Sequence, residues 1–155
     1  MLKKIFTFLF FIFLSSCGYE AIHSKKNISE YNFSLDKLNF TGDREINLKI
    51  KKKLNNFTLK PKDKNYILKI TTTSEKVTLV KNTSGDATSF QATITLNIDV
   101  LINNKIKNNF IITENFKYNN NSNKFDLKRY EREIKKNLTE IATEKLIFKL
   151  ANIKW

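Results

Sequence analysis

The stretch from Phe90 to Ile102 alternates apolar and polar residues over more positions than any other part of the chain. Its apolar positions are Phe90, Ala92, Ile94, Leu96, Ile98, Val100 and Ile102, and Leu101 is the one exception to the alternation. Successive side chains of a strand point to opposite faces of a sheet. The period of two therefore predicts a long strand with one buried face and one polar face.

The flanking segments predict a hairpin on each side of this strand. Asn103-Asn104 suits a two-residue turn, because Asn tolerates a positive φ. The strand beyond it continues the same parity through Ile106, Phe110, Ile112, Phe116 and Tyr118. On the other side, a turn cluster at 82–86 follows an extended segment, 66–80, whose apolar positions are Tyr66, Leu68, Ile70, Val77 and Leu79.

One strand and two helices complete the predicted domain. The strand covers 31–40, where the apolar parity changes between Leu35 and Leu38 and indicates a bulge. Thr41-Gly42-Asp43 can turn and cap a helix with the apolar positions Ile46, Ile50, Leu54 and Phe57, which ends before Pro61. A second, longer helix runs to about residue 152, with Leu127, Tyr130, Ile134, Leu138, Ile141 and Ala142 on one side.

The order β-α-β-β-β-α predicts an α+β fold, a two-layer sandwich with two helices on one face of a four-stranded, mostly antiparallel sheet. The other face of the sheet then has no covering layer. Its expected residues are Lys69, Thr71, Thr73, Gln91, Thr93, Thr95, Asn97, Asp99, Thr113 and Lys117. Such a surface is typical of the solvated side of an antiparallel sheet, and a binding surface is the alternative.

The amino terminus has the pattern of a secretory signal. Lys3 and Lys4 precede an apolar run from Ile5 to Leu14 that only Thr7 interrupts. A membrane-spanning helix is the competing interpretation, but ten residues at 1.5 Å each cover only about half of a ~30 Å hydrocarbon core. The pattern therefore predicts export.

Leu14-Ser15-Ser16-Cys17 resembles the lipobox of bacterial lipoproteins, in which the cysteine is acylated after cleavage. Cys17 is the only cysteine, so the chain cannot form an internal disulfide. An N-acyl diglyceride on Cys17 would hold the protein stably on a membrane, because two acyl chains suffice where one is marginal. The expected boundaries are a signal peptide at 1–16, a lipidated tether at 17–27 and one α+β domain at 28–155. Position 18 is Gly rather than the Asp that commonly retains lipoproteins at the inner membrane, which favours the outer membrane.

The chain is strongly basic. It has 28 Lys and Arg against 15 Asp and Glu, and without Lys3 and Lys4 the remaining 26 leave a balance of +11. In a cytoplasmic protein this would suggest nucleic acid, but export excludes that partner. Phospholipid head groups, peptidoglycan and lipopolysaccharide are the polyanions of the envelope. A solvated basic face in a protein from an A/T-rich genome is the alternative.

Nothing in the sequence indicates catalysis. His23 is the only histidine and lies in the tether, so the spacings of a metal site or of a Cys/His or Ser/His/Asp nucleophile are absent. No glycine-rich phosphate loop occurs, and no cofactor is expected beyond the lipid on Cys17. The sequence therefore predicts that the protein is not an enzyme.

Three segments together resemble the LPS-assembly lipoproteins of the LptE family. Cys17-Gly18-Tyr19 is similar to the family's Cys-Gly-aromatic start. The strands from Tyr66-Ile67-Leu68-Lys69-Ile70 through Val80-Lys81-Asn82 to the alternating run Phe90–Leu96 are similar to its central hairpin. The closing helix, with Ala142, Leu146-Ile147-Phe148-Lys149-Leu150 and Ile153, is similar to its ending.

This resemblance implies an outer-membrane lipoprotein on the periplasmic side that plugs the lumen of the β-barrel LptD and helps lipopolysaccharide reach the outer leaflet. Lipid A phosphates would pair with basic residues near a loop tip. Lys81, at the end of the hairpin, is the first candidate, followed by Lys124, Lys128 and Arg129 around the start of the last helix. Two alternatives stay open: a lipid-anchored periplasmic module that binds an anionic glycan or phospholipid without a barrel, and a pilotin-type lipoprotein for another outer-membrane machine.

Overall fold

The computed structural model describes residues 31–58 and 61–154. Within these ranges the elements follow in the order β1, α2, η2, β2, β3, β4 and α3, where η2 is a short 3-10 helix. The predicted signal peptide, Cys17 and the whole tether lie outside the described residues and stay predictions. No helix in the described part of the chain is both long and apolar enough to cross a membrane.

The sheet has the strand order β1-β2-β3-β4. Its strands are β1 (Ser34–Gly42), β2 (Asn65–Lys81), β3 (Ala87–Ile102) and β4 (Lys105–Asn119). β1 pairs with β2 in parallel, whereas β2, β3 and β4 form antiparallel pairs. The register of β1 shifts between Leu35 and Lys37, which confirms the predicted bulge.

The β3–β4 turn has the predicted geometry. Asn103 has a φ of 50° and Asn104 a φ of 62°. Two successive positive φ values define a type I′ turn, whose twist matches that of the flanking strands. The choice of Asn at both positions therefore sets the register of the hairpin.

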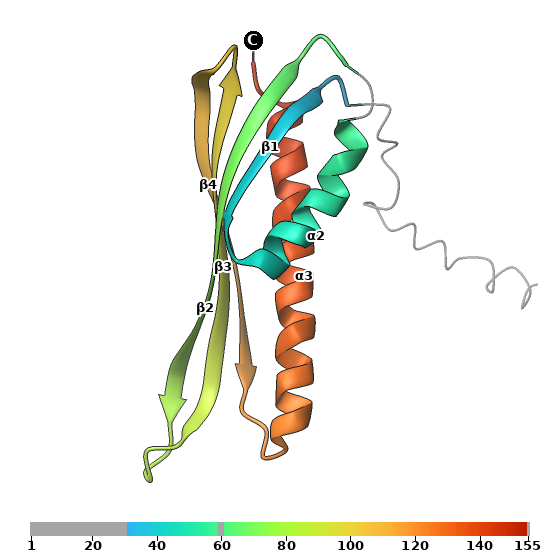
Figure 1. Ribbon diagram of the computed structural model, residues 1–155. Coiled ribbons are helices and arrows are strands. Elements are labelled where there is room, and N and C mark those ends of the chain that lie inside the picture. The colour runs from blue at the N-terminus through green and yellow to red at the C-terminus, as the bar shows by residue number, and fades with distance from the viewer. Residues whose placement is uncertain (1–30, 59–60, 155) are drawn as a thin grey trace, which may run out of the picture. The chain divides into compact units, whose positions relative to one another are not determined.

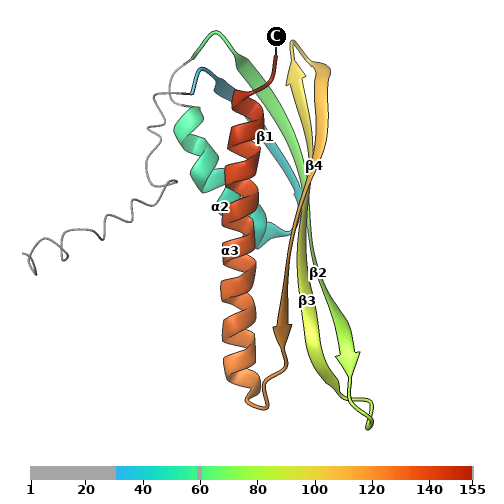
Figure 2. The same cartoon turned by 180° about the vertical axis from the view of Figure 1, so that it is seen from behind.

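Two helices cover one face of the sheet. They are α2 (Arg44–Leu54), which continues into η2 (Asn55–Phe57), and α3 (Lys124–Ala151). Both ribbons lie on the same side of the four strands, and the two views agree on this (Figures 1 and 2). The predicted α+β two-layer sandwich is confirmed, with β1 as its one parallel strand.

The core lies between the sheet and the helices. Its fully buried side chains include Ile46, Ile50 and Leu54 from α2, Leu96 and Ile98 from β3, and Leu146 and Leu150 from α3. Thr72 is also buried, at an otherwise apolar position of β2. The 3.6 and 2.0 periods therefore identified the helix and strand faces that pack together.

Several apolar positions expected in the core are exposed instead. These are Val77, Leu79, Ile106, Phe116, Tyr130 and Ile141. Val77 pairs with Gln91, on the face opposite the one that carries the buried Leu68, Ile70 and Thr72, and a register shift pairs Ile106 with Leu101. The other exposed positions lie where no neighbouring element covers them, so all six core assignments were wrong.

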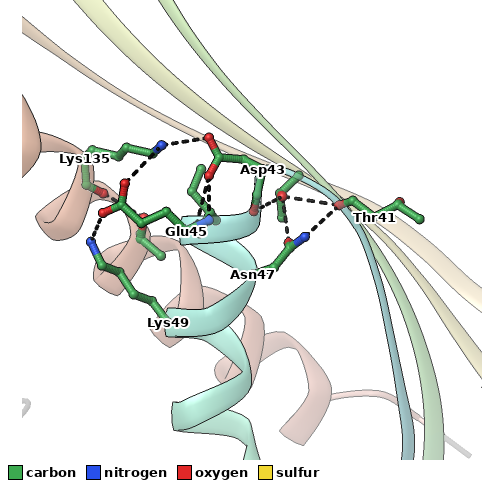
Figure 3. A network of polar contacts seen from close by, with 9 residues as sticks. Thr41, Asp43, Glu45, Asn47, Lys49 and Lys135 are labelled. Atoms are coloured by element: carbon green, nitrogen blue, oxygen red, sulfur yellow. Dashed lines mark hydrogen bonds and ion pairs between the residues drawn. The ribbon is translucent and has the colours of Figure 1, made fainter.

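A polar network joins the start of α2 to α3 and to β2 (Figure 3). The Asp43 carboxylate accepts hydrogen bonds from the backbone N–H groups of Glu45 and Ile46, and its other oxygen lies 2.7 Å from Lys135 Nζ on α3. The buried Thr72 hydroxyl lies 2.7 Å from the Asn47 side-chain oxygen. Asp43 thus caps α2 and also ties it to α3.

Asp43 is expected to make stability depend on acid pH. Burial would raise its pKa, but the Lys135 ammonium and the two backbone N–H groups outweigh burial and lower the pKa below the ordinary 3.8. A lowered pKa means that Asp43 stabilises the fold above about pH 4 and that this contribution is lost as the pH falls through the lowered value.

Asp43→Ala, which removes both cap and charge, is expected to cost about 1–2 kcal/mol at pH 7. Asp43→Asn keeps a capping oxygen, so its loss should be smaller and should shrink between pH 5 and pH 3 as the wild-type carboxylate is protonated. Urea unfolding followed by circular dichroism at both pH values measures this. An Asn variant whose deficit is the same at both pH values would contradict the charge argument.

Candidate functional site

The face of the sheet opposite the helices is mainly polar through its middle. The pairing places Thr73, Thr95 and Thr113 in one row across three strands, and Thr71 and Asn97 in the next. Neither α2 nor α3 covers this face (Figures 1 and 2). The surface predicted from the alternation is therefore present, and we call it the polar sheet face.

Short side-chain hydrogen bonds stabilise this face internally. The hydroxyls of Thr41 and Thr71 lie 2.8 Å apart, and those of Thr95 and Thr113 lie 3.4 Å apart. Asn109 of β4 also donates to Asp99 of β3, at 2.5 Å. Cross-strand Thr–Thr pairs and Asn–Asp pairs hold neighbouring strands together while leaving a flat, hydrophilic surface. Val77, which pairs with Gln91, and Ile111, which is 60% exposed, are apolar exceptions on this face.

Lys81 lies where β2 ends, at the tip of the long β2–β3 hairpin. The tip is ordered by Asn82, whose side-chain oxygen accepts from Asp86 N and whose backbone carbonyl accepts from Gly85 N. Lys81 is exposed and forms no ion pair with any residue in 31–58 or 61–154. Its charge is therefore available to a partner.

Lys124, Lys128 and Arg129 lie in the first two turns of α3. The helix begins after Asn123, whose side chain accepts from Phe125 N and Asp126 N. Arg129 is paired with Asp126 at 3.0 Å, whereas Lys128 has no ion pair among the described residues. The start of α3 and the β2–β3 tip lie at the same end of the domain (Figures 1 and 2), which we call the basic end. The structure thus brings all four predicted cations to one end.

An open groove of about 1450 Å³ lies at the basic end, between the last residues of the strands and the first turns of α3. Of the four predicted cations only Arg129 lines it. Its other lining includes Leu79 and Val80 of β2, Lys117 and Tyr118 of β4, and Asp126, Tyr130 and Glu133 of α3. The groove therefore offers apolar, cationic and acidic groups together.

Glu131 holds α3 against the strands beside this groove. It accepts a hydrogen bond from Tyr118 Oη at 2.9 Å and pairs with Lys76, whose ammonium also lies 3.9 Å from the centre of the Phe90 ring. Burial and the Glu131 carboxylate raise the pKa of Tyr118 above its ordinary value, so the phenol keeps its proton. Tyr118 is thus a hydrogen-bond donor here and not an acid–base group.

Sequence reasoning did not assign Lys117, Tyr118 and Tyr130 to this end of the molecule as a site. The strand and helix periods predict Lys117 only for the polar face and both tyrosines for the core. Only the four residues 120–123 separate the end of β4 from the start of α3. This short loop is the one sequence signal that could have predicted that Lys117, Tyr118 and Tyr130 lie close together. No group of three His, Cys, Asp or Glu in the described part of the chain could hold a metal ion.

Comparison with known proteins decides the family. The family model described as "LptE: Lipopolysaccharide-assembly" matches residues 35–150, which is most of the chain. The chain belongs to the LptE family. The resemblance of the central hairpin and of the closing helix is therefore confirmed, and the match covers the sheet from Leu35 and α3 to Leu150, whereas the Cys17-Gly18-Tyr19 segment lies outside it.

Solved structures share the fold at low sequence identity. A minor lipoprotein from Acinetobacter baumannii is similar with a TM-score of 0.60 and 15% identity, over 78% of this chain and 91% of that one. An uncharacterized lipoprotein B from Nitrosomonas europaea has a TM-score of 0.54 and 13% identity, over 80% and 88%. A putative lipoprotein from Caulobacter crescentus has a TM-score of 0.52 and 11% identity, over 74% and 87%. No curated protein sequence matches the chain.

Membership of the LptE family makes this chain a lipoprotein of lipopolysaccharide assembly, associated with the cell envelope. The family is one of assembly proteins rather than enzymes, which agrees with the absence of catalytic spacings in the sequence. The role of each cation at the basic end stays a prediction.

Proposed function

We propose that this LptE-family protein is anchored to the outer membrane through lipid on Cys17, plugs the lumen of the LptD β-barrel, and contacts lipopolysaccharide through the basic end. The observation that carries the proposal is the polar sheet face, which no helix covers. The lumen of a large outer-membrane barrel is polar, so a plug needs a hydrophilic surface with its own apolar core behind it. A sheet with a polar outer face, backed by two helices, meets both requirements.

The cations support the contact with lipopolysaccharide. Ammonium and guanidinium groups form charge-assisted hydrogen bonds with phosphate oxygens. Lys81 and Lys128 are exposed and carry no ion pair with a described residue, so an anion need not displace an internal partner. Arg129 would have to share its guanidinium with Asp126. We therefore rank Lys81 and Lys128 first as contacts to lipopolysaccharide and Arg129 last. Lys124 comes between, because its ammonium makes only a long contact to the Asn120 side chain.

The test is affinity purification of the Cys17-intact protein from detergent-solubilised membranes. A large β-barrel recovered in stoichiometric amount is the expected result. Thr95→Trp places a bulky ring at the centre of the polar sheet face and should reduce barrel recovery by about tenfold or more, since overpacking a complementary interface typically costs more than 1 kcal/mol. Lys136→Trp, on the exposed side of α3, is the matched control and should keep the barrel.

The same preparation tests the contact with lipopolysaccharide. Lys81→Glu should weaken lipopolysaccharide binding while barrel recovery stays normal, because the substitution lies at an exposed tip. Lys105→Glu is the control, because Lys105 is an exposed lysine that begins β4 next to the β3–β4 turn, at the opposite end of the sheet. Equal binding by Lys81→Glu and the wild type would remove Lys81 from the site. A protein that is recovered alone with bound lipid would favour the barrel-free binding module, for which the 1450 Å³ groove provides the space.

A further inference from the structure

The solvent side of α2 is a basic stripe. Ile46, Ile50 and Leu54 face the core, so the opposite side of the helix carries Arg44, Leu48, Lys51 and Lys52. Leu48 is 58% exposed and lies one turn from each of the three cations. A single exposed leucine is common on a protein surface, so the cluster of three cations around it is what distinguishes this stripe.

The acidic residues near α2 do not neutralise this stripe. Glu45 is held by Lys49 at 2.8 Å and by Lys135 at 3.4 Å. On the side of α2 that faces α3, Lys53 is paired with Glu144 at 2.9 Å. Arg44, Lys51 and Lys52 form no ion pair within residues 31–58 and 61–154. The three cations therefore present their full charge to the surroundings.

The segment that leads back to Cys17 leaves the described domain beside the end of α2. The Tyr31 ring lies 5.9 Å from the ring of Phe57, in the 3-10 turn that extends α2, and Lys62 Nζ donates to the Tyr31 carbonyl. Thirteen residues lie between Cys17 and Tyr31, so the fourteen Cα–Cα steps of even a fully extended tether reach only about 50 Å. An acylated Cys17 would therefore tether the domain to the lipid surface through a point beside the end of α2.

We propose that the outer stripe of α2 docks on anionic phospholipid head groups of the membrane that holds the Cys17 lipid, while the protein is not in a barrel. This inference rests on the proposed acylation. Each cation near an anionic leaflet raises the docked population by about fivefold, and high salt screens the attraction. Because α2 packs on the side of the sheet opposite the polar sheet face, docking turns that face away from the bilayer and leaves it open to a partner.

The test places an environment-sensitive fluorophore on the stripe of the full lipoprotein. Cys17 is the only cysteine, so once it is acylated, Leu48→Cys supplies one free thiol for labelling. Phe125→Cys, at a 70% exposed position at the start of α3, supplies the matched control label. Both proteins are reconstituted in vesicles of phosphatidylcholine alone or with about one third phosphatidylglycerol, and mass spectrometry verifies the acylation before the measurement.

A blue shift of the label at 48 in anionic vesicles only, reversed by molar salt, is the expected result, with the label at 125 unchanged. Lys51→Glu with Lys52→Glu should reduce the docked fraction by about 25-fold or more, and Lys105→Glu with Lys107→Glu should leave it unchanged. Identical spectra in neutral and anionic vesicles, or a shift at 125 rather than at 48, would overturn the proposal. An unacylated Cys17 would instead refute the anchoring in the proposed function, so the two failures are distinguishable.

Discussion

Gly42→Ala is expected to destabilise the domain by about 3 kcal/mol or more, which in a domain of this size lowers the melting temperature by more than about 10 °C. Gly42 ends β1 with a φ of +92°, a region that residues with a Cβ rarely adopt. A Cβ on Gly42 would also lie 1.9 Å from the Thr72 carbonyl oxygen of the neighbouring strand. That oxygen accepts the hydrogen bond from Asp43 N at 3.1 Å, so relief of the clash separates β1 from β2 and disturbs the cap of α2.

Gly85→Ala is the matched control. Gly85 has a similar φ of +87°, but a Cβ there would meet no atom within 4 Å. The backbone strain alone costs about 1–2 kcal/mol, so the difference between the two variants measures the close approach to Thr72. Urea unfolding of both proteins, followed by circular dichroism, provides the comparison. Equal losses at positions 42 and 85 would show that the approach of β1 to β2 is not as tight as the structure indicates.

Phe33→Ala is expected to cost about 3–5 kcal/mol of unfolding free energy, since it removes a large side chain from a closed apolar site. Phe33 is 1% exposed and stacks on Phe57, with ring centres 4.8 Å apart and planes 6° from parallel. Tyr66 and Tyr31 pack against it at 5.9 and 6.0 Å. This aromatic cluster closes the core where the chain enters the domain, so its loss should also loosen the end of α2.

Phe33→Leu separates aromatic stacking from burial. Leucine keeps most of the apolar volume, so about 1–2 kcal/mol should remain as the cost of the lost ring contacts and the imperfect fit. Phe125→Ala is the surface control and should change stability by less than about 0.5 kcal/mol, because this ring is mostly in solvent. A Phe33→Ala protein with a wild-type unfolding midpoint would contradict the buried cluster.

Membrane docking through α2 and plugging through the polar sheet face use opposite sides of the same domain. A lipoprotein that first lies on the leaflet would present its sheet outward, and capture by a barrel would then require only that the salt-sensitive contact of α2 release. The two proposals therefore predict different effects for the two kinds of variant. Charge reversal on α2 should reduce binding to anionic vesicles, and a bulky side chain on the polar sheet face should reduce recovery of the barrel.

The local patterns of the sequence sufficed for the elements and for their order. Period two in 90–102 and the Asn103-Asn104 turn are properties of neighbouring residues, and the backbone rules that connect them to a strand and to a type I′ turn need no distant contact. The family resemblance likewise rests on segments of sequence, and the match over 35–150 confirmed it.

What the tertiary structure decided is how far each element extends past its neighbours. Phe116 and Tyr130 have the parity or spacing of core residues, yet both are exposed, and β2 continues past Thr72, where β1 stops. The groove that includes Lys117 and Arg129, the pairing of Asp43 with Lys135 and the free charges of α2 arise in the same way. Burial and ion pairing depend on which surfaces meet in space, and residues far apart along the chain carry no local signal of that meeting.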